Sequence, residues 1–323
     1  MKKILLVLGV AAAAMTSCTS DEVVEMNQSN LIKFESFVNK STRAVTEINS
    51  LTNFYVFGGY TTPYNNVFNN TLIGSDGKTT AEWTANIYKF AAYTNAATND
   101  GPSGTDVSFD GTTLKFPDYV VSDANDLIAA APQTVDNTSL NNPNVSLTFK
   151  HMLAQVKFTF TNEDNSHKLS VSKISVAGVK NQGTGSIVEN GTISWSSLDV
   201  VNDYSMSYES QTVSASGTYA PEFQMVIPQD LTNIKISFTV SFIDSNEEVV
   251  STETFNNISL IYDNETETPT NNFTAWQPGY RYNYTASFPS DPKTIQFNVI
   301  VDDWEDKTAS GNNELPGDDQ MDF

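Results

Sequence analysis

The chain has 323 residues, 39% of them hydrophobic and 11% aromatic, and its 17 Lys and Arg against 38 Asp and Glu leave a formal net charge of −21. The length predicts two domains, and so many core-forming side chains exclude a disordered chain. The negative charge argues against nucleic acid as a partner, and two histidines with a single cysteine argue against a Cys/His zinc site and exclude an internal disulfide.

A basic pair followed by an apolar run opens the chain. Lys2 and Lys3 precede the apolar residues 4–14, a run too short to span a bilayer and typical of a secretory signal. The small residue and the cysteine that follow resemble a bacterial lipobox, in which the chain is cut before Cys18 and the thiol carries a diacylglycerol. We therefore predict a signal peptide at 1–17 and a lipid anchor on Cys18 in the outer membrane. An ordinary signal peptide with a chance cysteine is the alternative.

The first expected strand covers residues 31–38. Ile32, Phe34 and Val38 fall on one face of it, because side chains alternate between the faces of a strand. A polar stretch follows and contains Arg43, one of only two arginines in the chain. We expect this stretch to be exposed.

The remaining body also predicts strands. Apolar and polar residues alternate most clearly at 234–242, and the phase of the alternation slips between Leu153 and Val156, which predicts a β-bulge or two joined strands. Strands are predicted at 53–58, 145–153, 156–160, 169–179, 223–227, 234–242, 280–288 and 295–301. Short strands separated by frequent turns favour β-sandwiches.

Four other features complete the pattern. Residues 123–131 predict a short helix that Pro132 ends, and the segments 60–80 and 94–106 predict long surface loops. A polar break at 162–166 predicts a domain boundary.

The chain carries no recognisable catalytic motif. A nucleophile–His–acid triad would have to use one of the two histidines. His151 shares a strand face with apolar residues, which predicts a core or interface histidine, and His167 lies in a polar turn, which predicts a solvated side chain. We therefore expect no enzyme activity, no bound metal and no cofactor.

Several segments, in order over nearly all of the chain after residue 40, resemble those of a known family. They are 41–44, 51–57, 126–130, 145–160 (VSLTFKHMLAQVKFTF), 169–179, 227–229, 276–282 and 297–304 (FNVIVDDW). Together they are similar to the fimbrillin family of Bacteroidales, the lipoprotein-derived subunits of type V pili. The resemblance implies an all-β fold of two transthyretin-like β-sandwich domains in tandem. It also implies a place in surface fimbriae, with other fimbrial subunits as partners and adhesion and biofilm formation as roles.

The resemblance also implies how the chain is divided. The expected segments are a signal peptide at 1–17, a propeptide with the first strand at 18–43, sandwich domains at 44–163 and 164–306, and an acidic tail at 307–323.

An arginine-specific protease cuts members of this family near their N-terminus, and here the cut would fall between Arg43 and Ala44. Loss of strand 31–38 would leave an apolar slot that a strand from a neighbouring subunit can fill. In the family the C-terminal segment commonly supplies that strand. The acidic tail here lacks a clean alternation, which argues against a polymerising stalk subunit, while a tip, an anchor and an accessory subunit all stay open.

Two other classes of function remain alternatives. A surface glycan-binding lipoprotein of an outer-membrane uptake system would use exposed aromatic rings such as Trp83, Trp195 or Trp276. A β-sandwich hydrolase would need carboxylates that face each other across a cleft.

Overall fold

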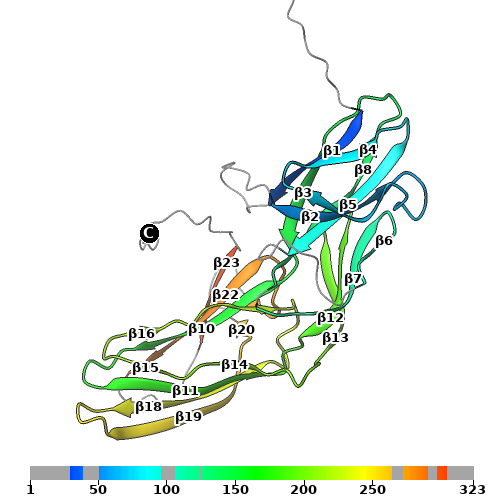
Figure 1. Ribbon diagram of the computed structural model, residues 1–323. Coiled ribbons are helices and arrows are strands. Elements are labelled where there is room, and N and C mark those ends of the chain that lie inside the picture. Colours follow the sequence, from blue (N-terminus) through cyan, green and yellow to red (C-terminus); the bar gives the residue numbers. More distant parts are fainter. Residues whose placement is uncertain are drawn as a thin grey trace, which may run out of the picture.

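The structure is a computed structural model (Figure 1) that describes residues 30–38, 51–95, 106–123, 125–263, 272–289 and 297–303. These residues form strands, turns and connecting segments and no helix, so the prediction of an all-β fold is confirmed for the described part of the chain. None of the described segments is a helix of the length and hydropathy that crossing a membrane requires.

The first part of the chain builds a seven-stranded sheet in the order β3-β2-β5-β8-β9-β1-β4. Its strands are β1 (Leu31–Val38), β2 (Asn53–Gly59), β3 (Phe68–Gly74), β4 (Lys78–Glu82), β5 (Ile87–Asn95), β8 (Leu127–Asp136) and β9 (Val145–His151). The pairing of β1 with β9 is parallel, and the other pairs of this sheet are antiparallel.

A four-stranded sheet in the order β13-β12-β7-β6 packs against it. The strands are β6 (Ser108–Phe109), β7 (Thr113–Val120), β12 (Gln182–Val188) and β13 (Ile193–Asp199). Side chains of β5 therefore enter two cores: Tyr88 and Phe90 enter one, whereas Ala91 and Tyr93 enter the other beside Phe116. This explains why β5 is apolar on both faces.

The second part of the chain is a sandwich of two further sheets (Figure 1). One has the order β16-β10-β22-β23 with β17 also on β10, and the other has the order β14-β11-β18-β19 with β15 also on β11. The strands are β10 (Ala154–Asn162), β11 (Lys168–Ala177), β14 (Met206–Tyr208), β15 (Gln211–Val213), β16 (Thr218–Tyr219), β17 (Gln224–Val226), β18 (Lys235–Ile243), β19 (Val249–Ser259), β22 (Tyr280–Phe288) and β23 (Asn298–Asp303), and a separate pair is formed by β20 (Tyr262–Asp263) and β21 (Asn272–Phe273).

The strongest alternation in the sequence becomes the best-defined core. Phe238 and Val240 of β18 are buried, as are Tyr282 and Tyr284 of β22, while their neighbours along each strand point outward. The phase slip after Leu153 is confirmed as the junction of two strands, β9 and β10.

Two sequence predictions are wrong. Residues 123–131 do not form a helix, because 127–131 lie in β8, where Ile128 faces one core and Ala129 the other, so the run reads as apolar without a period of two. The segment 60–80 is not one loop, because it contains β3 and the start of β4.

The polar break at 162–166 joins β10 to β11, and both strands belong to the second sandwich. Along the chain, Leu153 still packs in the first part of the molecule, whereas the next residue, Ala154, packs in the second. β12 and β13 then return to the first part by pairing with β7.

Candidate functional site

The candidate site is β1 and the groove that holds it. β1 pairs with β4 at Leu31 and Lys33, and with β9 from Phe34 to Val38. Although β1 precedes all the other described strands in sequence, it is therefore an inner strand of the sheet. Its removal would expose an edge of β9 and an edge of β4.

The apolar face of β1 is anchored by Phe34. This side chain is 2% exposed, and its ring contacts Phe68 and Phe90 edge-on, with centroid distances of 5.3 and 5.5 Å. Phe54 packs edge-on at 6.4 Å, and Ile32 is fully buried in the same core. Each edge-on aromatic pair adds about 0.5–1.5 kcal/mol to the burial of the ring itself.

The turn between β3 and β4 closes over β1. The backbone N–H of Phe34 donates to the carbonyl oxygen of Gly77 at 2.9 Å, and the Thr79 hydroxyl donates to the carbonyl oxygen of Ile32 at 2.6 Å. Gly77 has φ +65°, and a Cβ there would lie 1.8 Å from the Phe34 carbonyl oxygen. Only glycine lets the turn approach β1 so closely.

Beyond Phe34 the side of β1 away from β9 pairs with no strand among the described residues. A groove of about 360 Å³ lies there, lined by Lys33, Phe34, Glu35, Ser36, Phe37, Phe54, Ser75, Asp76 and Gly77. The buried Ser36 hydroxyl accepts a hydrogen bond of 3.2 Å from the Leu51 N–H. The chain thus leaves β1 at Val38 and is found again at Leu51 beside the same strand, so residues 39–50 connect two points that are close in space.

The predicted site residues Cys18, Arg43 and Ala44 all lie outside the described residues, so lipid attachment and cleavage stay predictions. Ile32 and Phe34 lie where the alternation placed them. Sequence reasoning missed Ser36, Gly77 and Thr79. The Asp76-Gly77 dipeptide signals a turn, but nothing in the sequence says that this turn closes over a strand more than forty residues earlier.

His151 is a core histidine, as predicted. Its Nδ1 lies 3.0 Å from the carboxylate of Asp126, and both side chains are buried. Burial raises the pKa of the nearby Tyr119, and the charge of Asp126 raises it further. This enclosure offers no surface at which a substrate could meet the pair.

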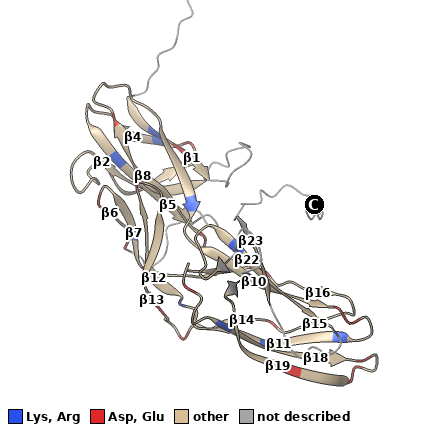
Figure 2. Ribbon diagram, turned by 180° about the vertical axis from the view of Figure 1, so that it is seen from behind, with Lys and Arg blue, Asp and Glu red and all other residues tan. Residues whose placement is uncertain are grey.

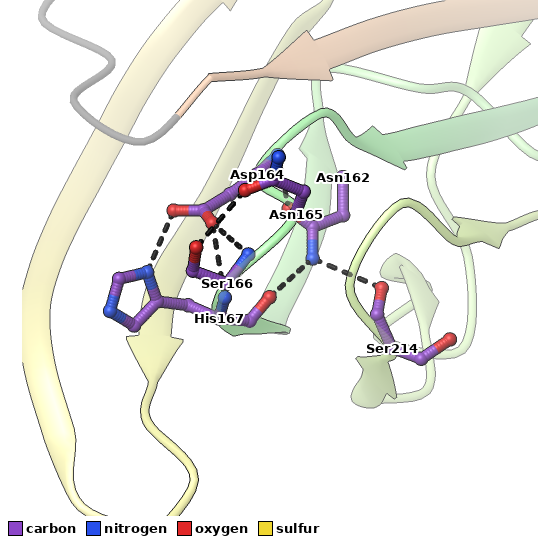
Figure 3. Close-up of polar contacts among 6 residues, drawn as sticks. All are labelled: Asn162, Asp164, Asn165, Ser166, His167 and Ser214. Carbon is purple, nitrogen blue, oxygen red and sulfur yellow. Dashed lines mark hydrogen bonds and ion pairs between the residues drawn. The ribbon is translucent and has the colours of Figure 1, made fainter.

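His167 is held in the turn between β10 and β11 rather than simply solvated (Figure 3). Its Nδ1 lies 2.8 Å from the carboxylate of Asp164, which also accepts the backbone N–H groups of Ser166 and His167 at 2.6 and 3.0 Å. Asn162 supports the turn by donating to the carbonyl oxygens of His167 and Ser214. Burial opposes ionisation of Asp164, but these hydrogen bonds outweigh it and lower the pKa of the carboxyl below 3.8. The arrangement stabilises a turn.

The three tryptophans that a glycan site would use form no exposed platform. Trp83 is 6% exposed and Trp276 is 1% exposed, each inside a core. Trp195 is half-buried, its indole N–H donates to the carbonyl oxygen of Met152 at 2.8 Å, and its ring lies against Gly185. Among the described residues, moreover, no three His, Cys, Asp or Glu side chains gather in a way that could hold a metal ion.

Comparison with known proteins supplies the family. A model of the fimbrillin-like family matches residues 42–304. The chain belongs to the fimbrillin-like family. A search of curated proteins found no match. The match begins at Thr42, so β1 lies outside the part of the chain that the fimbrillin-like model covers.

One solved structure agrees with this fimbrillin-like assignment at the level of the fold. A fimbrial protein from Bacteroides vulgatus is 16% identical, with a TM-score of 0.55, and the match covers 84% of this chain and 99% of that one. A structure described as that of a candidate cell adhesion protein from Bacteroides uniformis is 14% identical with a TM-score of 0.45, covering 85% of this chain and all of the other.

Proposed function

We propose that this fimbrillin-like protein is a structural subunit of cell-surface fimbriae that supports adhesion and biofilm formation and has no catalytic role. Subunits join by strand exchange after β1 has been removed. The observation that carries the proposal is the position of β1, which is a single inner strand with its apolar face buried, followed directly by the segment that contains Arg43. The match of the family model from residue 42 onward supports it too.

Cleavage between Arg43 and Ala44 would separate β1 from β2. β1 would then be held only by non-covalent contacts, of which the burial of Ile32 and Phe34 is the largest, at about 1.5–3 kcal/mol for each side chain and less if the unfolded segment is compact. A strand from a neighbouring subunit that restores these contacts recovers the same free energy. Exchange therefore needs no external source of energy.

The groove specifies what the incoming strand must look like. The strand must run parallel to β9 and place apolar side chains at the positions of Ile32 and Phe34. At the position of Ser36 it must place a small side chain, preferably one that accepts the Leu51 N–H. Three alternate positions in one register are enough to select a donor segment.

Anchoring before assembly is assigned to Cys18. Acyl chains on this residue, palmitate among them, would hold the precursor at the outer membrane until the protease that cuts after Arg43 releases the body of the subunit. Replacing Cys18 with Ala should abolish metabolic labelling with a radioactive fatty acid, and labelling that persists in Cys18→Ala would reject the anchor.

Limited digestion with an arginine-specific protease tests the cut. Only two arginines exist, and Arg281 lies in β22 between β10 and β23, so the native protein should yield one product that begins at Ala44. Mass spectrometry identifies this product, and electron microscopy with SDS gels shows whether elongated, SDS-resistant oligomers follow. The Arg43→Gln variant is the control and should form no elongated, SDS-resistant oligomers under the same treatment. A clean cut that never leads to oligomers contradicts strand exchange.

Peptide competition tests the groove itself. A synthetic peptide of residues 30–39 added to the cleaved protein should block oligomers by refilling the slot. The same peptide with Phe34→Ala should lose most of this effect, whereas Phe37→Ala should retain it, because Phe37 lies on the opposite face of β1. Equal inhibition by both altered peptides would show that the apolar face of β1 does not direct assembly.

A further inference from the structure

A second strand of the molecule offers a site for a partner without any cleavage. β19 pairs with β18 on one side and with no strand among the described residues on the other. It is the longest strand of the described part, with 11 residues, and Val249 and Val250 are 61% and 52% exposed. Figure 1 places it at the far end of the second sandwich from β1. An open edge of this kind recruits another strand.

β19 carries little charge in a strongly acidic chain. Glu253 is its only charged residue, and Figure 2 shows one red segment along a strand that is otherwise tan. Since two copies of a chain with a net charge of −21 repel each other, they approach most easily along such a strand.

The outward face beside this edge is lined with hydroxyl groups. The side chains of Ser241 and Thr252 lie 2.9 Å apart across β18 and β19, and those of Thr239 and Thr254 lie 3.3 Å apart. A hydroxyl both donates and accepts hydrogen bonds, so the hydroxyl groups of one copy can bond to the same hydroxyl groups of a second copy. The chemistry of the edge therefore suits a second copy of itself.

We propose that β19 pairs with β19 of a second copy of this chain, antiparallel about a two-fold axis, with Thr252 opposite its own counterpart. This inference is independent of strand exchange at β1.

Charge selects this register. In the neighbouring register that centres on Glu253, two carboxylates would face each other, and in the one that centres on Ser251, Glu253 would face Val249. With Thr252 at the centre, Glu253 faces Ser251, and Val249 faces Phe255. Both the carboxylate and the exposed valine then have suitable partners.

The regular segment of β19 that could pair with a second copy is short. The pairing of β19 with β18 is irregular near Val250 and again between Phe255 and Ile258, where Asn257 has φ +56°. One such contact binds weakly, but many copies arrayed along a fibre would add up to firm side-by-side association. The pairing itself does not depend on fibres; its role in joining fibres side by side rests on the proposed function, in which strand exchange at β1 lengthens them.

Disulfide trapping tests the register in a Cys18→Ala, Arg43→Gln background, in which neither a native thiol nor strand exchange contributes. Thr252→Cys should form a covalent dimer under mild oxidation, because the two cysteines face each other. Thr254→Cys, the matched control, should form at least tenfold less, because its two copies are offset by about 13 Å along the strand. Equal trapping of both variants, or trapping of neither, overturns the proposal.

Charge substitution gives a second measurement that needs no cysteine. Ser251→Lys should tighten dimerisation about three- to tenfold in analytical ultracentrifugation, because each new lysine faces a Glu253, and Ser251→Glu should weaken it by a similar factor. Ser194→Lys, at an exposed serine on β13 in the first part of the molecule, should change nothing. A chain that stays monomeric at millimolar concentration with Ser251→Lys rejects the proposal, whatever the outcome of cleavage at Arg43.

Discussion

β1 and β19 are both candidate points of assembly, and they differ in almost every physical respect. β1 pairs with β4 at its start and with β9 from Phe34 onward, and its apolar face is buried, whereas β19 has one neighbour and is exposed along nearly its whole length. A buried inner strand can exchange only if it is first cut free, and its loss creates a strong and specific slot. An exposed edge binds without cleavage but weakly. The comparison shows how a single β-protein can offer one assembly site that requires proteolytic cleavage and another that is available without it.

The largest expected effect comes from the anchor of β1. Phe34→Ala removes a ring that contacts three other phenylalanines, so the free energy of unfolding should fall by about 3–5 kcal/mol. Urea denaturation followed by tryptophan fluorescence measures the change. Phe37→Ala on the half-buried side of the same strand is the control and should cost about 1 kcal/mol or less. Equal losses would remove the distinction between the two faces of β1.

Gly77→Ala tests how much the turn over β1 contributes to the free energy of unfolding, compared with the Phe34 ring. The added Cβ meets the Phe34 carbonyl oxygen at 1.8 Å, a backbone atom that cannot move aside, so we expect a loss of about 2–3 kcal/mol. Gly191→Ala is matched in its positive φ, but its Cβ would meet only the end of the Lys150 side chain, which can swing away. Thermal unfolding should therefore show a clearly smaller shift for Gly191→Ala.

A smaller effect is expected in the second sandwich, in which β19 is the edge strand of one sheet. Asp164→Asn keeps the shape of the turn but weakens its charged hydrogen bonds, so stability at pH 7 should fall by about 1–2 kcal/mol. Because the pKa of Asp164 in the folded protein is lowered below 3.8, its contribution is fully present above that value and is lost as the pH falls through the folded pKa. The difference between the wild type and Asp164→Asn should thus shrink below about pH 4. A difference that is constant from pH 7 to pH 3 would contradict this origin.

The smallest effect is expected at the exposed edge. Val250→Ser should change the free energy of unfolding by about 0.5 kcal/mol or less, because the side chain is already 52% exposed. Circular dichroism during urea denaturation is sufficient to see this. A loss comparable to that of Phe34→Ala would mean that β19 is not the exposed edge described above.

Strands that alternate cleanly were predicted from the sequence, whereas β5 and β8, whose two faces enter different cores, were missed. β18 and β22 alternate cleanly because each has one face in the core and one outside. β8 was mistaken for a helix because two cores enclose 127–131 and remove the alternation. The candidate site follows the same rule: Ile32 and Phe34 follow from alternation, while Gly77 and Ser36 act through contacts distant in the sequence.

The sequence by itself determined the all-β character, nine of the 23 described strands, the apolar face of the first strand and the arginine that follows it, since each of these depends on residues close together in the chain. Only the tertiary structure decided that β1 lies between β4 and β9, that β12 and β13 return to pair with β7, and that β19 is left with an open edge. Strand order depends on which distant segments bury each other's apolar faces, and local periodicity carries no information about that choice.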